Sequence, residues 1–124
     1  MQTSISDWTG SRLSLTRQGK TAVVRLFNPP HGFMDELMES ELTLALDTLE
    51  DWKDGRVVVI TGAAPDMFVR HYDVSILQKR SQAMTERGKS FSVERPVPKS
   101  VIHLCIDRIE NSPLVFIAAL NGTA

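Results

Sequence analysis

The sequence contains a single cysteine, no block of like charges and no apolar run long enough to cross a membrane. Cys105 lies in the apolar run 101–106, so one chain holds neither a disulfide framework nor a cysteine cluster for zinc. A membrane span needs about 20 apolar residues, and residues 1–7 have neither the basic nor the apolar region of a secretion signal. We therefore expect a cytoplasmic protein with no metal site and no membrane partner.

Charge is nearly balanced, with 14 basic and 15 acidic residues, so nucleic acid is not an expected partner. Six prolines and seven glycines among 124 residues are too few for a disordered or fibrous chain. An apolar share of 42% with 23% charged residues is typical of a globular protein. A chain of this length forms one domain, which buries roughly two thirds of the surface of the unfolded chain.

The first expected elements are two strands, residues 12–17 and 21–27, joined by a turn at 18–20. Apolar and polar residues alternate in the first strand, and the pair predicts a β-hairpin. Pro29 and Pro30 then remove two backbone donors and disfavour a helix before them, so residues 28–32 are expected to form a loop.

From Met34 to Trp52 apolar residues recur every three or four positions, which predicts a helix with one buried face. Asp35 is its expected N-cap. The uniformly apolar segments 57–60 and 114–120 predict two parallel strands that are buried on both faces.

Two further helices are expected between these strands. The first begins near Asp73 and fades at residues 79–82, where the polar segment 79–98 predicts a mobile loop. The second is capped by Ser100. Its residues expected to face inward are Val101, Leu104, Cys105 and Ile109.

This order predicts an α/β fold with long βαβ connections between parallel strands. The sequence ends just after an apolar strand and the turn 121–122, although helices should follow to cover the sheet. We therefore expect a chain that is truncated just after residues 114–120, the third buried strand when the strand 21–27 is counted as the first.

Three segments resemble the crotonase, or enoyl-CoA hydratase/isomerase, superfamily. Residues 21–30 resemble the family's opening strand and Asn-x-Pro turn, and the helix start at residues 35–37 follows. Residues 57–62 and 67–74 are similar to a strand, Thr-Gly, and the loop Phe-Ser-x-Gly-x-Asp-Leu. Residues 112–124 resemble Lys-Pro-x-Ile-Ala-Ala-x-Asn-Gly-x-Ala, which in the family continues into a glycine cluster.

The resemblance implies the N-terminal part of a single crotonase-like domain of stacked ββα units, covering residues 1–124. It also implies an acyl-CoA substrate, no cofactor beyond the coenzyme A of that substrate, and a homo-oligomer, either a trimer or a hexamer. In the family, two backbone N–H groups form an oxyanion hole around the thioester oxygen and stabilise an enolate.

By the same resemblance, the first of these donors is the backbone N–H of Tyr72. The second donor and the acid/base carboxylates correspond to positions after Ala124, so we expect these 124 residues alone to be nearly inactive. Loss of one such donor typically costs about 10²- to 10³-fold in rate.

The resemblance also implies a substrate-binding loop that contains Phe68, Arg70, His71, Tyr72 and Asp73. Bulky residues replace the family's small ones here, and His71 stands in place of glycine. This change narrows the pocket or alters the acyl group that fits. Asp73 is interpreted as a helix cap or a first-turn acid, not as the catalytic carboxylate.

Two readings stay open for each basic residue near this site. His71 is either a base beside the thioester or a loop histidine that pairs with Asp66 or Asp73. Arg70 either binds a phosphate of coenzyme A or is solvated. His31 lies in the turn that the resemblance puts beside the adenosine end of coenzyme A, but a turn rich in Pro and Gly also accounts for it.

The leading hypothesis is an enoyl-CoA hydratase/isomerase-like enzyme of fatty acid metabolism, either a lyase or an isomerase. The alternative is a non-catalytic module of the same fold that binds coenzyme A or another subunit. The residues that would distinguish related reactions of the family are not among residues 1–124.

Overall fold

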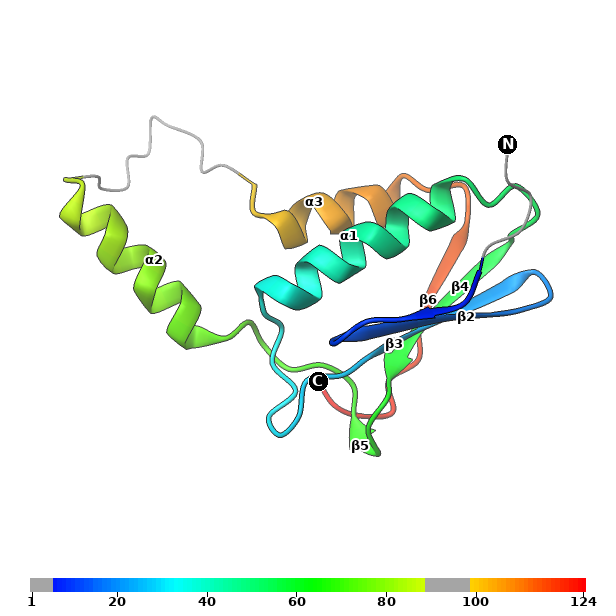
Figure 1. The fold of residues 1–124 in the computed structure, drawn as a ribbon, viewed down its shortest axis with the longest axis horizontal. Helices are drawn as coiled ribbons and strands as arrows, with labels where there is room; N and C mark the ends of the chain where they lie inside the picture. Colours follow the sequence, from blue (N-terminus) through cyan, green and yellow to red (C-terminus); the bar gives the residue numbers. More distant parts are fainter. Residues whose placement is uncertain (1–5, 89–98) are drawn as a thin grey trace.

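The computed structural model describes residues 6–88 and 99–124 (Figure 1). In chain order its elements are β1 (Trp8–Thr9), β2 (Leu13–Gln18), β3 (Thr21–Leu26), α1 (Glu36–Glu50), β4 (Val57–Gly62), β5 (Asp66–Met67), α2 (Val74–Glu86), α3 (Val101–Glu110), β6 (Val115–Ala118) and β7 (Gly122–Thr123). The predicted α/β class is confirmed.

One five-stranded sheet organises the described chain, with the strand order β1-β2-β3-β4-β6. The predicted hairpin is confirmed, because β2 and β3 are antiparallel and Leu13 pairs with Leu26. The pairs β3–β4 and β4–β6 are parallel, as predicted for strands joined by long connections. The short strands β5 and β7 form a separate parallel pair.

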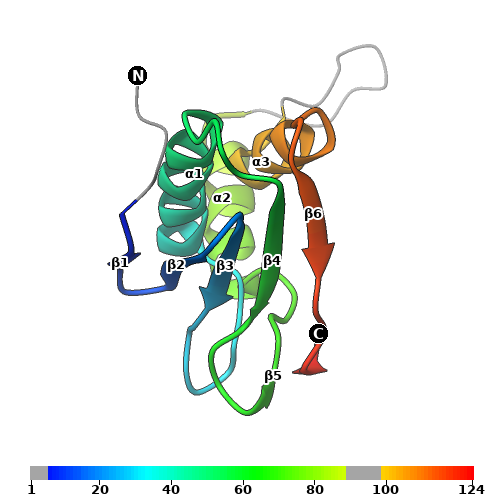
Figure 2. The same ribbon diagram turned by 90° about the vertical axis from the view of Figure 1, so that its right-hand side faces the viewer.

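Helices α1 and α3 lie side by side on one face of the sheet (Figures 1 and 2). The apolar stripe of α1 is buried as predicted and packs on the inward-facing residues of β2, β3 and β4, which alternate with outward-facing ones. The buried core consists of Leu13, Leu15, Ala22, Val24, Leu26, Met38, Leu42, Ala45, Leu46, Leu49, Trp52, Val58 and Cys105.

The inward face of α3 differs from the prediction. Cys105 is buried and its Sγ lies 3.4 Å from Thr43 Oγ1, and Ile109 packs on the core as predicted. Val101 and Leu104, however, are 47% and 51% exposed, and Ile102 packs on the core instead. Ile102, Cys105 and Ile109 are three and four residues apart, so they define the packed stripe of this helix.

The prediction that residues 57–60 and 114–120 are buried on both faces is wrong for the described chain. Val58 is fully buried under the helices, but Val115 and Ile117 of the edge strand β6 are 59% and 48% exposed. Their register neighbours Val57 and Val59 are only half-buried. The described helices therefore cover one face of the sheet. The apolar side chains of its other face are not covered by described residues.

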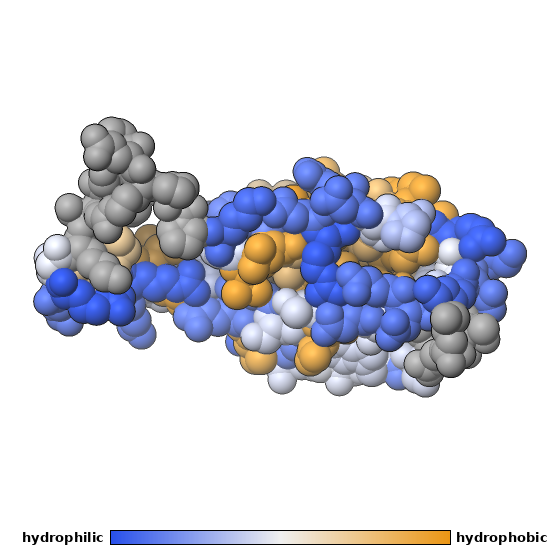
Figure 3. Space-filling model, turned by 90° about the horizontal axis from the view of Figure 1, so that it is seen from above, coloured by the Kyte–Doolittle hydropathy of each residue, from blue (hydrophilic) through white to orange (hydrophobic). Residues whose placement is uncertain are grey.

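Helix α2 extends away from the sheet and contains no buried residue (Figure 1). It runs to Glu86, so the predicted loop 79–98 is wrong for residues 79–86; residues 89–98 lie outside the described chain. Figure 3 looks onto the helices and shows apolar patches between hydrophilic ones. No helix among the described residues has the length and hydropathy that crossing a bilayer requires.

Candidate functional site

Three loops meet at one edge of the sheet, because they follow the carboxyl ends of three parallel strands (Figure 2). Residues 27–35 follow β3, residues 63–73 follow β4, and residues 119–124 follow β6. In open α/β sheets, ligands bind outside the carboxyl ends of the strands. This edge is therefore the candidate functional site.

The side chain of Asn121 joins the third loop to the second. The backbone N–H of Gly62 donates to its Oδ1 at 3.1 Å. Its Nδ2 donates to the carbonyl oxygens of Gly62 at 3.3 Å and Ala64 at 3.1 Å. One amide thus satisfies three backbone groups and fixes the path of the chain after β4.

The strands β5 and β7 continue this junction, and they approach so closely that glycine is required. A Cβ on Gly122 would lie 2.0 Å from the backbone carbon of Asp66, and one on Gly62 would lie 1.8 Å from the Met67 oxygen. The N–H of Phe68 then donates to the carbonyl of Thr123 at 2.8 Å. The start of the loop around Phe68 is therefore held by residues 121–123.

The second half of the loop 63–73 pairs with the loop 27–35, which follows β3. Arg70 N–H donates to Gly32 O at 2.7 Å, Met34 N–H to His71 O at 3.2 Å, and Asp73 N–H to Met34 O at 2.8 Å. The last two bonds form a parallel bridge between Met34 and Tyr72. In such a bridge the groups of Met34 bond to the residues on either side of Tyr72.

This pattern leaves the backbone N–H of Tyr72 directed away from Met34. Within the described residues, no acceptor hydrogen-bonds to that N–H. The N–H is fixed between two bonded neighbours and remains available as a donor. A fixed, free N–H at the carboxyl edge of a sheet can bind a negatively charged or carbonyl oxygen.

A cation and two imidazoles surround the ring of Phe33. His31 stacks on this ring with centroids 5.2 Å apart, and His71 lies against it at 4.9 Å. The guanidinium carbon of Arg70 is 5.1 Å from the ring centroid, and its NH1 donates to His31 O at 3.4 Å. The His71 Nδ1 lies 2.9 Å from Tyr72 O. The expected pairing of His71 with Asp66 or Asp73 is therefore not the contact that this ring makes.

Beside these loops is a hollow of about 150 Å³, lined by Phe68, Met67, Met38 and the two prolines Pro29 and Pro30, among others. A larger hollow of about 280 Å³ lies at the opposite end of the sheet, between Leu46, Pro113 and Phe116. Arg108 lines this hollow and already pairs with Asp47 at 2.9 Å and Glu50 at 3.0 Å. Of these two hollows, the smaller one adjoins the candidate site, where the loops after β3 and β4 line it.

The phenol of Tyr72 points to α1 and donates a short hydrogen bond to Glu39 Oε1. Arg80 of α2 donates to the phenol oxygen at 3.0 Å, and its guanidinium lies 5.3 Å from the ring centroid. Desolvation, and secondarily the bond to Glu39, raises the pKa of Tyr72 to about 12. The phenol therefore stays protonated and donates at neutral pH.

Asp73 caps α2, as predicted. Its Oδ1 accepts the backbone N–H of Ser75 at 3.0 Å and the Ser75 hydroxyl at 2.7 Å. These bonds, mainly that from the hydroxyl, hold the pKa of Asp73 below its usual value. The carboxylate faces the helix start and not the Tyr72 N–H.

The structure brings most of the predicted residues together. His31, Arg70 and His71 share one cluster, Tyr72 follows them in the loop, and Phe68 lines the hollow. Sequence reasoning missed three residues of this site: Phe33, Glu39 and Asn121. Asn121 stood in the motif Asn-Gly without an assigned role, and Glu39 lies beside the apolar stripe of α1, where an acidic residue is unusual.

Several solved structures share this arrangement of strands and helices. An enoyl-CoA hydratase from Geobacillus kaustophilus superposes with a TM-score of 0.74 over 96% of this chain, at 20% identity. DspI of Pseudomonas aeruginosa gives 0.69 over 91% at 20% identity. Human enoyl-CoA hydratase domain-containing protein 3 gives 0.67 over 90% at 21% identity.

The chain has the crotonase fold. The resemblance of the sequence motifs to this family is thereby confirmed at the level of the fold. The chain spans about two fifths of the length of these crotonase-fold structures: 41%, 42% and 40% respectively. No protein-family model matches the sequence. No curated protein matches it either.

Proposed function

We propose that the protein acts on acyl-CoA thioesters as an enoyl-CoA hydratase/isomerase-like enzyme, with the Tyr72 backbone N–H as one donor of an oxyanion hole. The observation that carries this proposal is the N–H of Tyr72, which no described residue accepts and which is held between two bonded neighbours at the carboxyl edge of the sheet. The crotonase fold supports the same substrate class.

The chemistry follows from where charge develops. When a proton leaves the carbon beside a thioester, or water adds to a conjugated enoyl group, negative charge collects on the carbonyl oxygen. A donor whose direction is already set stabilises that charge without reorganising during the reaction. Tyr72 would supply this bond from its backbone, so the chemical nature of its side chain is not part of this step.

The cluster around Phe33 would bind the remainder of the substrate. Arg70 presents a guanidinium, whose planar donors match phosphate oxygens, and the rings of His31 and His71 offer stacking surfaces beside it. Coenzyme A carries both phosphates and an aromatic base. We assign Arg70, His31 and His71 to its binding, and Phe68 to the acyl side because it lines the apolar hollow.

The test compares crotonyl-CoA with free coenzyme A in calorimetric titrations of the protein, followed by infrared spectroscopy of the complex. We expect tighter binding of crotonyl-CoA and a thioester carbonyl stretch at lower frequency than in water, because the Tyr72 N–H polarises the carbonyl. The experiment measures binding and not turnover, because the chain spans about two fifths of the enzyme structures that it resembles. Absence of crotonyl-CoA binding would contradict the proposal.

The alternative is a non-catalytic module that binds coenzyme A. The cluster of Arg70, His31 and His71 favours it, because a cation beside stacking rings accounts for coenzyme A binding without the Tyr72 N–H. Equal affinities for the two ligands, with an unshifted carbonyl band, would support the module and exclude the enzyme.

A further inference from the structure

Glu39 is a buried carboxylate for which the proposed reaction has no use. It lies on α1, and only 2% of its surface is exposed. Burying a carboxylate is unfavourable unless its oxygens are hydrogen-bonded. Glu39 Oε2 accepts the backbone N–H of Ile102, at the start of α3, at 2.7 Å, and Oε1 accepts the phenol of Tyr72.

Arg80 extends this set of contacts to α2. Its NH2 donates to the Tyr72 oxygen at 3.0 Å and lies 3.5 Å from Glu36 and 4.0 Å from Glu39. Hydrogen bonds in such a chain polarise one another, so the bond from Arg80 strengthens the one from Tyr72 to Glu39. Because α2 has no buried residue, these contacts join it to the body of the fold.

Tyr72 is therefore restrained in two independent ways. Its neighbours His71 and Asp73 bond to Met34, which fixes the backbone on one side. Its phenol bonds to Glu39, which fixes the side chain on α1. These two restraints fix the direction of the Tyr72 N–H, which bonds to no acceptor among the described residues.

We propose that Glu39 and the phenol of Tyr72 are positioning residues, which hold the Tyr72 N–H in the direction needed to bind the thioester oxygen. This inference rests on the proposed function. Productive geometry requires an accuracy of about 0.5 Å and 10–20°, which is normally set by hydrogen bonds behind the reacting group. Here a buried carboxylate supplies that support through the side chain of the donating residue.

A purely structural role for the same contacts makes a different prediction. If Glu39 only caps α3, then losing the Tyr72 bond changes stability but leaves the Tyr72 N–H as rigid as before. If Glu39 positions the N–H, losing the bond increases the motion of that N–H even in fully folded protein.

The experiment uses Tyr72→Phe and Glu39→Gln in the full chain, with Glu50→Gln as a matched control on the same helix. Glu50 is an exposed acid that pairs with Arg108 at 3.0 Å, far from the loops. The first measurement is the NMR order parameter of the residue-72 N–H without ligand. We expect it to fall from the rigid value of ~0.85 in both test variants and to stay there in the control.

A second pair of variants separates the contribution of α2. Arg80→Gln removes the donor to the phenol, and Arg87→Gln removes an arginine of the same segment whose Nε bonds only to Ala83 O at 3.2 Å among the described residues. We expect a smaller fall in the order parameter for Arg80→Gln than for Glu39→Gln, and none for Arg87→Gln.

The second measurement is the carbonyl stretch of bound crotonyl-CoA. The shift seen with wild-type protein should be lost in Tyr72→Phe, while coenzyme A still binds within about 3-fold, a difference below 1 kcal/mol. Tyr72→Phe is the decisive variant if Glu39→Gln fails to fold. An unchanged order parameter in Tyr72→Phe overturns the inference. Wild-type protein that binds no acyl-CoA overturns the proposed function, and the order parameter then decides whether the two residues hold the N–H.

Discussion

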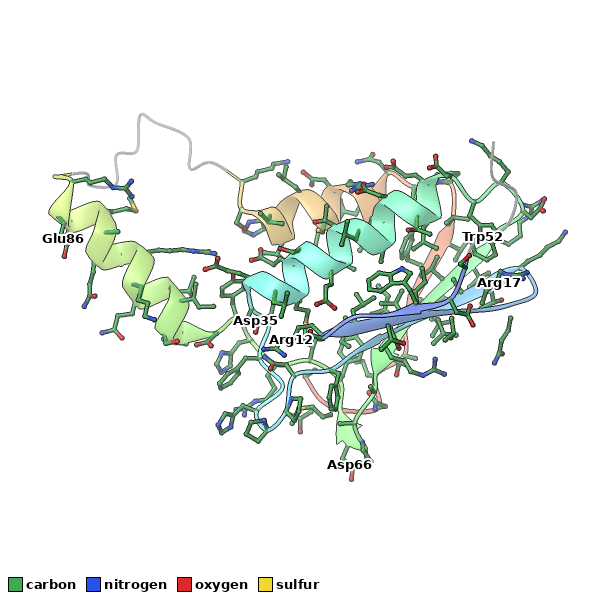
Figure 4. All side chains as sticks on the ribbon, viewed as in Figure 1. Arg12, Arg17, Asp35, Trp52, Asp66 and Glu86 are labelled. Atoms are coloured by element: carbon green, nitrogen blue, oxygen red, sulfur yellow. The ribbon has the colours of Figure 1, made fainter. Side chains whose placement is uncertain are left out.

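Asp35 and Arg12 form an ion pair, with Arg12 Nε 3.0 Å from Asp35 Oδ2 (Figure 4). This pair joins the start of β2 to the start of α1. The same carboxylate accepts the Met38 N–H at 2.9 Å and the Asn28 side chain at 3.3 Å. Asp35 therefore fixes the end of the loop 27–35, which carries Phe33 into the candidate site.

We expect Asp35→Ala to lower the free energy of unfolding by about 1–2 kcal/mol, because the N-cap bond to Met38 is lost. Asp35→Asn keeps the cap acceptor but places an NH2 group where Oδ2 accepts hydrogen bonds from Arg12 Nε and Asn28 Nδ2. It should cost less than Asp35→Ala, about 1 kcal/mol, since the cap remains and Arg12 is partly solvated. Urea denaturation measures both. Equal losses in the two variants would assign the stability to the ion pair and not to the cap.

The single tyrosine of the chain allows a direct test of the raised pKa. Tyrosinate absorbance of the folded protein should rise with a midpoint near pH 12, whereas the urea-unfolded chain should titrate near 10.0, the usual pKa of a tyrosine. The protonated phenol is favoured in the folded state, so its stabilisation is complete below about pH 10 and is lost as the pH rises toward 12.

Glu39→Gln removes a negative charge and a strong acceptor from the phenol, so the folded midpoint should move toward 10.0 but stay above it, because burial remains. A wild-type midpoint near 10.0 would show that the phenol is solvated and that the bond to Glu39 does not persist in solution.

Gly122→Ala should separate β5 from β7, because its Cβ would lie 2.0 Å from the backbone of Asp66. We expect a loss of about 1–3 kcal/mol, typical of an added methyl group without space. The chemical shifts of Phe68 should change, since its N–H bonds to Thr123. Thr123→Ala is the control: its side chain is exposed, and a change within about 0.5 kcal/mol is expected.

Much of the fold was predictable because its signals are local. The alternation in β2, the Pro29–Pro30 break and the stripe of α1 each determine their own segment. Helix α2 was only partly predicted, because a helix that buries nothing has no apolar periodicity to detect. The uniform apolarity of β6 indicated burial, but what covers a sheet face depends on tertiary packing, which a single strand does not encode.

The candidate site was predictable only where a motif existed. The loop 68–73 followed from resemblance. Its junction with residues 121–123, through the hydrogen bond from Phe68 to Thr123, was not predicted. The contact of Tyr72 with Glu39 joins residues 33 positions apart. No spacing rule links them, because their approach depends on how α1 lies against the sheet.

The hairpin of β2 and β3 also has a consequence for the order in which the fold assembles. Only Gly19 and Lys20 separate these strands, whereas the chain between β3 and β4, and between β4 and β6, includes whole helices. Closing a short loop costs far less chain entropy than closing a long one. We therefore expect the hairpin to form early and to act as the template on which β4 and then β6 pair, so that the three loops of the candidate site come together last.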